Sequence, residues 1–156
     1  MAPTASIRMR KVLAAADGAA PPEFPDGVCA VPFVPALHAR PAHALLAAAH
    51  PDRGESFDEW WTGLSRDAEF DADTFFIAID AHGGVAGAAI CWNVPFVKDI
   101  VVAPAWRRRG LGAALMRHAF AWFARRGHQH VDLKVDSGNV DARGLYHRLG
   151  MRELPA

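Results

Sequence analysis

The feature that most constrains the fold is a basic, glycine-bearing turn between an apolar run and a long amphipathic pattern. The apolar run extends from Phe96 to Val102, and the pattern after the turn repeats apolar residues at helical spacing. The turn consists of Arg107, Arg108, Arg109, Gly110, Leu111, Gly112 and Ala113. Glycines let backbone N–H groups approach an anion closely, and a helix N-terminus carries partial positive charge. The segment therefore predicts a strand, a turn and a helix that hold a phosphorylated ligand.

The composition excludes several classes of protein. The chain has 156 residues, 51% of them apolar, and its 17 basic and 17 acidic residues balance. This length and apolar content predict one domain with a sizeable core, and zero net charge argues against a nucleic-acid partner. No apolar run approaches the roughly 20 residues of a membrane span. Cys29 and Cys91 are far apart in sequence, which favours a cytoplasmic protein without a disulfide framework or thiolate zinc site, and we expect no metal.

The order of expected elements indicates an α+β fold. Residues 1–25 form an N-terminal extension that contains a linker, and residues 26–156 form the domain. The expected strands are 28–33, 74–80, 85–92, 96–102 and 131–135. The expected helices are 36–49, one that starts with Ser56 as its cap and carries Trp60, Trp61 and Leu64, 111–126 and 139–149. Strands 74–102 form an antiparallel run. Strands 96–102 and 131–135 are joined through a helix, so they should be parallel, and the sheet is mixed.

Two motifs resemble the signatures of one known family. The turn fits Gln/Arg-x-x-Gly-x-Gly/Ala, and the segment from Asn139 to Met151 fits Asn-x-x-Ala-x-x-Leu-Tyr-x-x-Leu-Gly-Phe/Met without a mismatch. Over about residues 74–151 the chain therefore resembles the GNAT superfamily of acyl-CoA N-acyltransferases. This resemblance implies a mixed, mostly antiparallel sheet with a splayed parallel central strand pair and flanking helices.

The resemblance also implies acetyl-CoA (coenzyme A) as co-substrate. Its pyrophosphate would lie on the backbone N–H groups of Arg109 to Ala113, beside Arg107, while Arg108 and Arg109 reach the adenosine 3′-phosphate or solvent. In the family the pantetheine arm pairs with the splayed strand, which implies contacts to the backbone of Ile100, Val101 and Val102. Asn139 could both cap the last helix and touch the cofactor arm.

Two residues are candidates for catalysis. Tyr146, the only tyrosine, falls at the family position near the CoA sulfur, so its phenol could protonate the leaving thiolate; a core aromatic is the alternative. Asp99 lies in the splayed strand and could act as general base or bind the amine. An ion pair of Asp99 with Lys98 or Arg107 stays open, as does a water relay without a dedicated base.

These features predict an N-acetyltransferase. The acceptor, a primary amine on a small molecule or peptide, would attack acetyl-CoA directly in a ternary complex. A non-catalytic acyl-CoA-binding sensor with the same fold is the alternative. The acceptor pocket should involve the first helices and the loop 93–97, with aromatic residues as candidates for its lining. Its chemistry is not readable from the sequence.

The chain departs from the family after the last helix. Family members usually add two strands there, whereas only six residues follow Gly150, so the C-terminal strands should be shortened. The edge beside the strand 131–135 would then be exposed. Either the segment from Ser6 to Leu13 folds back as a strand, or a second subunit covers the edge, so both monomer and homodimer remain open.

Overall fold

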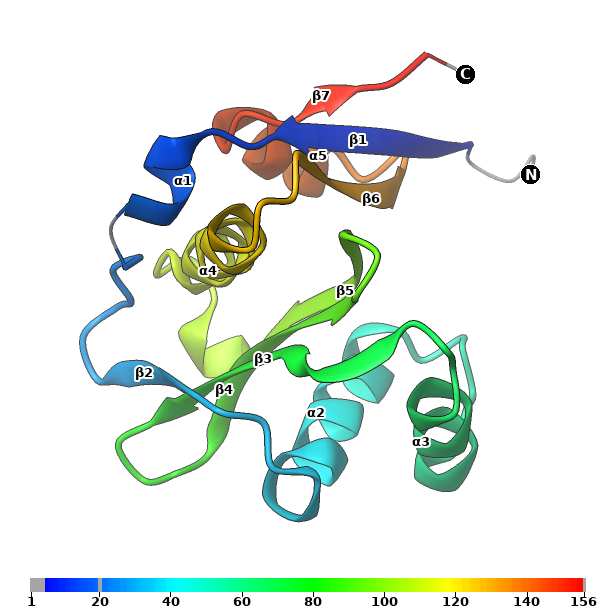
Figure 1. Ribbon diagram of the computed structural model, residues 1–156. Helices are drawn as coiled ribbons and strands as arrows, with labels where there is room; N and C mark the ends of the chain where they lie inside the picture. The colour runs from blue at the N-terminus through cyan, green and yellow to red at the C-terminus, as the bar shows by residue number, and fades with distance from the viewer. Residues whose placement is uncertain (1–4, 20, 156) are drawn as a thin grey trace.

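A computed structural model describes residues 5–19 and 21–155 as seven strands in one sheet with helices on both faces (Figure 1). The strands are β1 Ser6–Val12, β2 Val28–Val31, β3 Phe70–Asp80, β4 Val85–Trp92, β5 Phe96–Val102, β6 His130–Asp136 and β7 Arg152–Glu153. The helices are α1 Ala15–Ala19, α2 Pro35–Ala49, α3 Phe57–Ser65, α4 Leu111–Arg125 and α5 Val140–Arg148, with a 3-10 turn η1 at Pro104–Trp106. The strand order is β2-β3-β4-β5-β6-β1-β7. Only β5 and β6 pair in parallel, which confirms the predicted α+β class with its mixed sheet.

The parallel pair β5–β6 is short and then opens. Phe96 is paired with Asp132 and Val97 with Leu133, and no later residues of the two strands are paired. Figure 1 shows β6 diverging from β5 beyond this point. Strands that separate within a sheet leave backbone groups without a neighbouring strand, and these groups are free to bind a ligand.

A bulge in β5 determines where Asp99 points. Consecutive residues Ile90 and Cys91 of β4 pair with Asp99 and Val97, so Lys98 is an extra residue in β5. A bulge of this kind turns the following side chains to the other face of the sheet. Val97 accordingly packs into the core beneath α4, whereas Asp99 shares the opposite face with Val101, on the side of α2.

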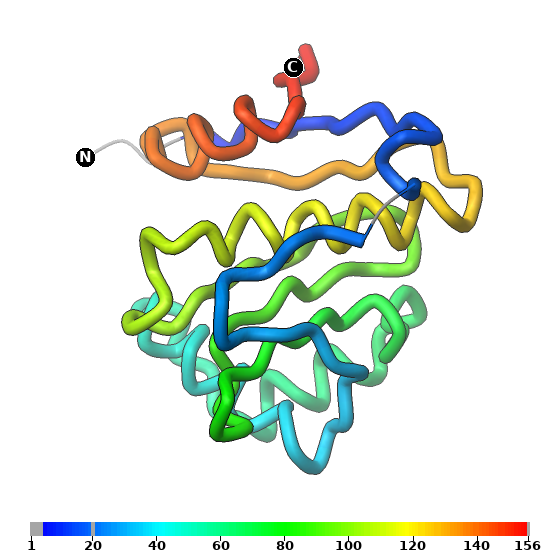
Figure 2. Tube along the Cα trace, turned by 90° about the vertical axis from the view of Figure 1, so that its left-hand side faces the viewer, coloured from blue at the N-terminus to red at the C-terminus, as the bar shows by residue number. Residues whose placement is uncertain are grey.

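Two apolar cores lie on the two faces of the sheet. One joins α4 and α5 to β1, β6 and one side of β3–β5, with Met9, Leu115 and Phe123 fully buried. The other joins α2 and α3 to the opposite side, around Leu46 and Ile90. In Figure 2, α4 crosses the middle of the molecule between the β1–β6 pair above and the green strands below. None of the helices in the described ranges is long and apolar enough to cross a membrane.

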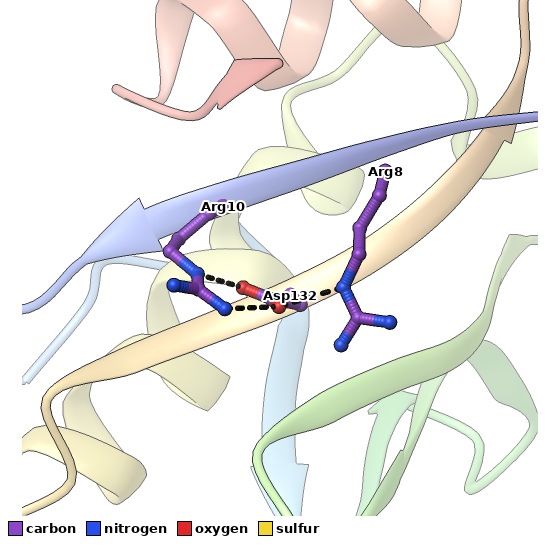
Figure 3. Close-up of polar contacts among 3 residues, drawn as sticks. All are labelled: Arg8, Arg10 and Asp132. Atoms are coloured by element: carbon purple, nitrogen blue, oxygen red, sulfur yellow. Dashed lines mark hydrogen bonds and ion pairs between the residues drawn. The ribbon is translucent and has the colours of Figure 1, made fainter. Parts of the chain in front are cut away.

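The N-terminal strand β1 covers the edge of β6. It pairs antiparallel with β6 over its whole length and with β7 on its other side. A buried carboxylate holds the pair: Arg10 donates through Nε and Nη2 to Asp132 at 2.7 and 2.9 Å, and Arg8 donates through Nε at 2.8 Å (Figure 3). Of the two alternatives for this edge, the structure therefore has the folded-back strand. Residues 1–4, within the extension predicted over 1–25, lie outside the described residues, as do Ala20 and Ala156.

Several element boundaries differ from the sequence expectations. The expected linker contains α1, because Asp17 accepts a hydrogen bond from the Ala14 N–H and Gly18 packs on α4, where Arg125 bonds its carbonyl oxygen. Strand β2 ends at Val31 because the next residue is a proline, which has no N–H to donate. Strand β3 begins at Phe70, ahead of an irregularity in its pairing with β4. Helix α2 continues through Pro41.

Candidate active site

A cleft of about 220 Å³ lies between the diverging strands β5 and β6. Its walls come from both faces of the sheet: Asn139 and Tyr146 from the α5 side, and His50 and Arg53 from the end of α2. Predicted residues Asp99 and Ile100 line it from β5. The cleft therefore joins the two faces of the molecule at the point where the sheet is interrupted, and two different ligands can enter it from opposite sides.

Tyr146 lies at the inner wall of this cleft. It is 7% exposed and packs with the core beneath α4. Burial raises the pKa of its phenol, and the negative charge of Asp99 raises it further. The hydroxyl group therefore stays protonated at neutral pH and is able to donate a proton. Tyr146 is thus both a core aromatic and a candidate acid, so the two readings of the sequence are compatible.

Asp99 is almost fully buried and forms ion pairs with two cationic side chains. Arg53 Nη1 lies 2.9 Å from its Oδ1, and Lys98 Nζ lies 3.0 Å from its Oδ2. One partner, Lys98, is the bulged neighbour that the sequence offered as an alternative; the other comes from the turn after α2. The carboxylate is therefore held in place, and an incoming ammonium group would have to compete with these cations for it.

Asn139 begins α5, as expected of a cap. Its Oδ1 accepts a hydrogen bond from the Ala142 N–H at 3.2 Å. An asparagine amide has two further N–H donors, which a cap bond to the oxygen leaves available. Because Asn139 also lines the cleft, one side chain can cap the helix and bind a ligand there.

The basic turn lies against the far end of β5 and has an open helix N-terminus. Gly110 precedes α4 with a φ of 82°, a left-handed conformation that suits glycine, and no side chain caps the helix. The first helical bond runs from the Ala114 N–H to the Gly110 carbonyl, so the N–H groups before it can receive an anion. Arg107 Nε donates to the Val102 carbonyl at 3.3 Å. This contact places the turn at the end of the diverging strand.

The remaining predicted residues divide between the core and the surface. Val101 is buried beneath α2, whereas Ile100 and Val102 pack partly against the core beneath α4. Arg108 and Arg109 are exposed, and Arg109 lies over the Trp106 ring at 5.0 Å. None of the residues from Arg107 to Ala113 lines the 220 Å³ cleft.

Sequence reasoning missed four polar residues of the cleft. His50 and Arg53 come from the turn between α2 and α3, and Lys134 and Asp136 come from β6. A signal existed for the first two, since a short polar turn between two apolar helices often carries functional side chains. Lys134 had no such signal, because an exposed lysine on an alternating strand is unremarkable.

The aromatic candidates for an acceptor pocket separate into two groups. Trp60 is buried, and Trp61 and Phe70 pack against the same core beneath α2. Trp92 and Phe96 instead line a neighbouring hollow of about 330 Å³. Lys134 borders both this hollow and the cleft.

The buried thiol of Cys91 is unsuited to covalent catalysis. It is 1% exposed, and burial strongly raises its pKa. A nucleophilic cysteine needs the opposite shift, which favours the thiolate. Within the described ranges, no group of three histidine, cysteine, aspartate or glutamate residues is arranged to hold a metal ion.

Comparison with known proteins gives one family. A family model for the acetyltransferase (GNAT) family matches residues 39–151. Streptothricin acetyltransferase from Streptomyces lavendulae is 38% identical over 121 residues, which are 74% of this chain and 61% of that protein. Mycothiol acetyltransferase from Clavibacter sepedonicus is 32% identical over 114 residues, which are 71% of this chain and 38% of that protein.

Solved structures resemble the fold over nearly its whole length. A GCN5-related N-acetyltransferase from Sphaerobacter thermophilus superposes with a TM-score of 0.83 and 26% identity, covering 98% of this chain and 50% of the other. The chain therefore spans about half of that structure and less than two thirds of the two curated relatives.

Proposed function

Since the chain belongs to the acetyltransferase (GNAT) family, we propose that it transfers an acetyl group from acetyl-CoA to a primary amine. The observation that carries this proposal is the cleft between β5 and β6, which brings Asp99 and Tyr146 together from opposite faces of the sheet. The donor would enter from the side of α4 and α5, and the amine from the side of α2. Both would then be bound at once, as direct attack in a ternary complex requires.

The basic turn and the unpaired edge of β5 have the groups that would bind a coenzyme A molecule. The uncapped N-terminus of α4 would hold the pyrophosphate through the N–H groups of Arg109 to Ala113, with Arg107 beside it. Arg108 and Arg109 would support the adenosine phosphate. The unpaired edge of β5 from Ile100 to Val102 would bind the pantetheine arm, assisted by the amide of Asn139.

The reaction divides between two side chains. Asp99 would orient the acceptor as its ammonium form, in exchange for Arg53 or Lys98. Once the ammonium group has lost one proton, the amine nitrogen bonds to the thioester carbonyl carbon, the carbon–sulfur bond breaks, and Tyr146 gives its phenolic proton to the sulfur. The second proton that the nitrogen loses restores the Tyr146 phenol. A backbone N–H of β5 would stabilise the negative charge on the carbonyl oxygen. The pKa of Tyr146 supports this role, because it keeps the phenol protonated until the thiolate leaves.

The acceptor is proposed to be a small-molecule or peptide amine. The relatives named above carry the names of streptothricin and mycothiol acetyltransferases, which supports a small-molecule amine first. We also propose a cytoplasmic location, because Cys29 and Cys91 are both free thiols. With β1 covering the edge of β6, the fold does not require a second subunit there, and we propose a monomer.

Tyr146→Phe tests the proposal, because it removes only the hydroxyl group. We expect CoA release with an amine panel to fall about 100-fold in kcat, since that is the typical contribution of general acid catalysis. Acetyl-CoA affinity, measured by calorimetry, should change little. Trp106→Phe, an aromatic substitution outside the cleft, serves as the control.

Two outcomes would contradict the proposal in different ways. Unchanged turnover in Tyr146→Phe would remove the acid role from this residue. Tight acetyl-CoA binding without CoA release from the wild-type chain, across the whole amine panel, would favour the acyl-CoA sensor instead.

A further inference from the structure

The proposed reaction leaves the acceptor's proton without a destination. An ammonium ion must lose a proton before its nitrogen can attack a thioester. Asp99 is poorly placed to take it, because each carboxylate oxygen already accepts from a cation, Oδ1 from Arg53 and Oδ2 from Lys98. A proton arriving at Asp99 would neutralise the carboxylate that holds both the amine and the remaining cation.

His50 lies in the same cleft with a ring that has no such partners. Among the described residues, no hydrogen bond or ion pair engages its imidazole, whereas its backbone is fixed on both sides. Its N–H donates to the Leu46 carbonyl at 2.8 Å, and its carbonyl accepts from the Arg53 N–H at 3.1 Å. The main chain thus positions the ring, while the ring itself stays available to a ligand.

Charged groups of both signs surround His50. Within the cleft it faces the cations of Arg53, Lys98 and Lys134. The acidic and phenolic groups there are Asp99, Asp136 and Tyr146, and Asp99 is already paired with two of the cations. In the small cavity on its other side, His50 neighbours His43 and Glu55. A neutral imidazole has one ring nitrogen with a free lone pair, so the ring can accept a proton from a bound ligand.

We infer that His50 removes the proton from the acceptor amine, while Asp99 only holds the amine in place. This inference rests on the proposed function. One proton first passes from the bound ammonium group to the free ring nitrogen of His50. The neutral nitrogen then bonds to the carbonyl carbon as the carbon–sulfur bond breaks. Tyr146 supplies a separate proton to the sulfur, and the second proton that the nitrogen loses restores the Tyr146 phenol. His50 is half-buried, so its proton then returns to solvent between turnovers.

The test compares His50→Gln with His43→Gln in the full chain. His43 lies in α2, which ends just before His50, but its Nε2 is 3.0 Å from the Glu55 carbonyl oxygen and it does not line the cleft. CoA release is measured with acetyl-CoA and the best amine of the panel between about pH 5.5 and 9. In the wild type and in His43→Gln, kcat/KM should rise with pH through an acidic limb.

In His50→Gln, kcat should fall about 100-fold and the acidic limb should disappear. The KM for acetyl-CoA should stay unchanged, and added imidazole should restore part of the rate. His50→Ala provides more room for imidazole and shows whether the rescue depends on the vacated ring position. Calorimetric acetyl-CoA binding establishes that each variant is folded.

The outcomes separate this inference from the proposed function. An acidic limb that persists in His50→Gln but disappears in Asp99→Asn overturns the inference and assigns the proton to Asp99. A limb that persists in both variants also overturns it and favours a water relay. Absence of CoA release from the wild type with every amine would overturn the proposed function, and the inference with it.

Discussion

The two walls of the cleft belong to two parts of the sheet that are held together differently. In β3–β4–β5, neighbouring strands are consecutive in the chain and are joined by short turns. In β6–β1–β7, a strand from the N-terminal end lies between two from the C-terminal end, and the Arg8–Asp132 ion pair joins residues 124 positions apart. The β5 wall of the site therefore depends on local turns, and the β6 wall depends on pairing between strands from the two ends of the chain.

Removing residues 1–13 should have the largest effect, because it removes β1 from between β6 and β7. Met9 at the centre of β1 is fully buried, and the β6 wall of the cleft would lose its neighbour. We expect a loss on the order of a domain's whole free energy of unfolding, about 5–15 kcal/mol. Urea unfolding followed by circular dichroism would measure this, with removal of residues 1–5 alone as control. A truncated chain that unfolds at the wild-type urea concentration would contradict the comparison.

The two parts also differ in how far the sequence predicts them. Local patterns predicted the strands that became β4 and β5, the turn ending in Gly110 and the helix beginning at Asn139. These features depend on residues a few positions apart, where glycine conformation, capping and periodicity act. For β1 the sequence left two alternatives, because an open edge beside the strand 131–135 does not indicate whether a distant segment of the same chain or a second subunit covers it.

The residues of the site also divide into those that the sequence predicts and those that it does not. Tyr146 and Asn139 were identified from one motif, and they lie in the cleft together. Arg53 and His50 were not identified, because their position depends on the bulge at Lys98 and on packing of α2 against the sheet. A one-residue insertion in a strand decides which face receives Asp99, and periodicity alone does not reveal it.

Asp132→Asn should have the next largest effect on stability. The substitution removes the charge that holds Arg8 and Arg10, and leaves a buried amide in its place. Breaking a buried ion pair costs about 3–5 kcal/mol, but both arginines reach water, so we expect about 2 kcal/mol. Thermal unfolding would measure the loss. Asp136→Asn, on the exposed end of the same strand, is the control and should change stability by less than about 0.5 kcal/mol.

The Asp132 carboxylate should also make the stability that comes from the β1–β6 pair sensitive to acid. Burial raises the pKa of Asp132, but hydrogen bonds and charges from Arg10 and Arg8 outweigh it, so the pKa lies below its usual value. A group whose pKa falls on folding stabilises the protein fully above its unfolded pKa, about 3.9. This contribution is lost as pH falls below about 4 through the folded pKa. Wild-type stability should therefore fall more steeply there than that of Asp132→Asn; parallel curves would show that Asp132 makes no net contribution.

Gly83→Ala should have the smallest effect, because it disturbs only the local turn between β3 and β4. Gly83 has a φ of 81°, which alanine adopts at a cost of about 1–2 kcal/mol, and an added Cβ would meet nothing within 4 Å. We expect a loss of about 1 kcal/mol in urea unfolding with unchanged acetyl-CoA binding, because the strands on each side keep their pairing. Gly63→Ala is the matched control: it is equally open, but lies within α3 without a positive φ, so alanine should stabilise by about 0.5–1 kcal/mol. If Gly83→Ala destabilised the protein as much as Asp132→Asn, the local turns would be no more tolerant than the long-range pairing, and the distinction between the two walls would fail.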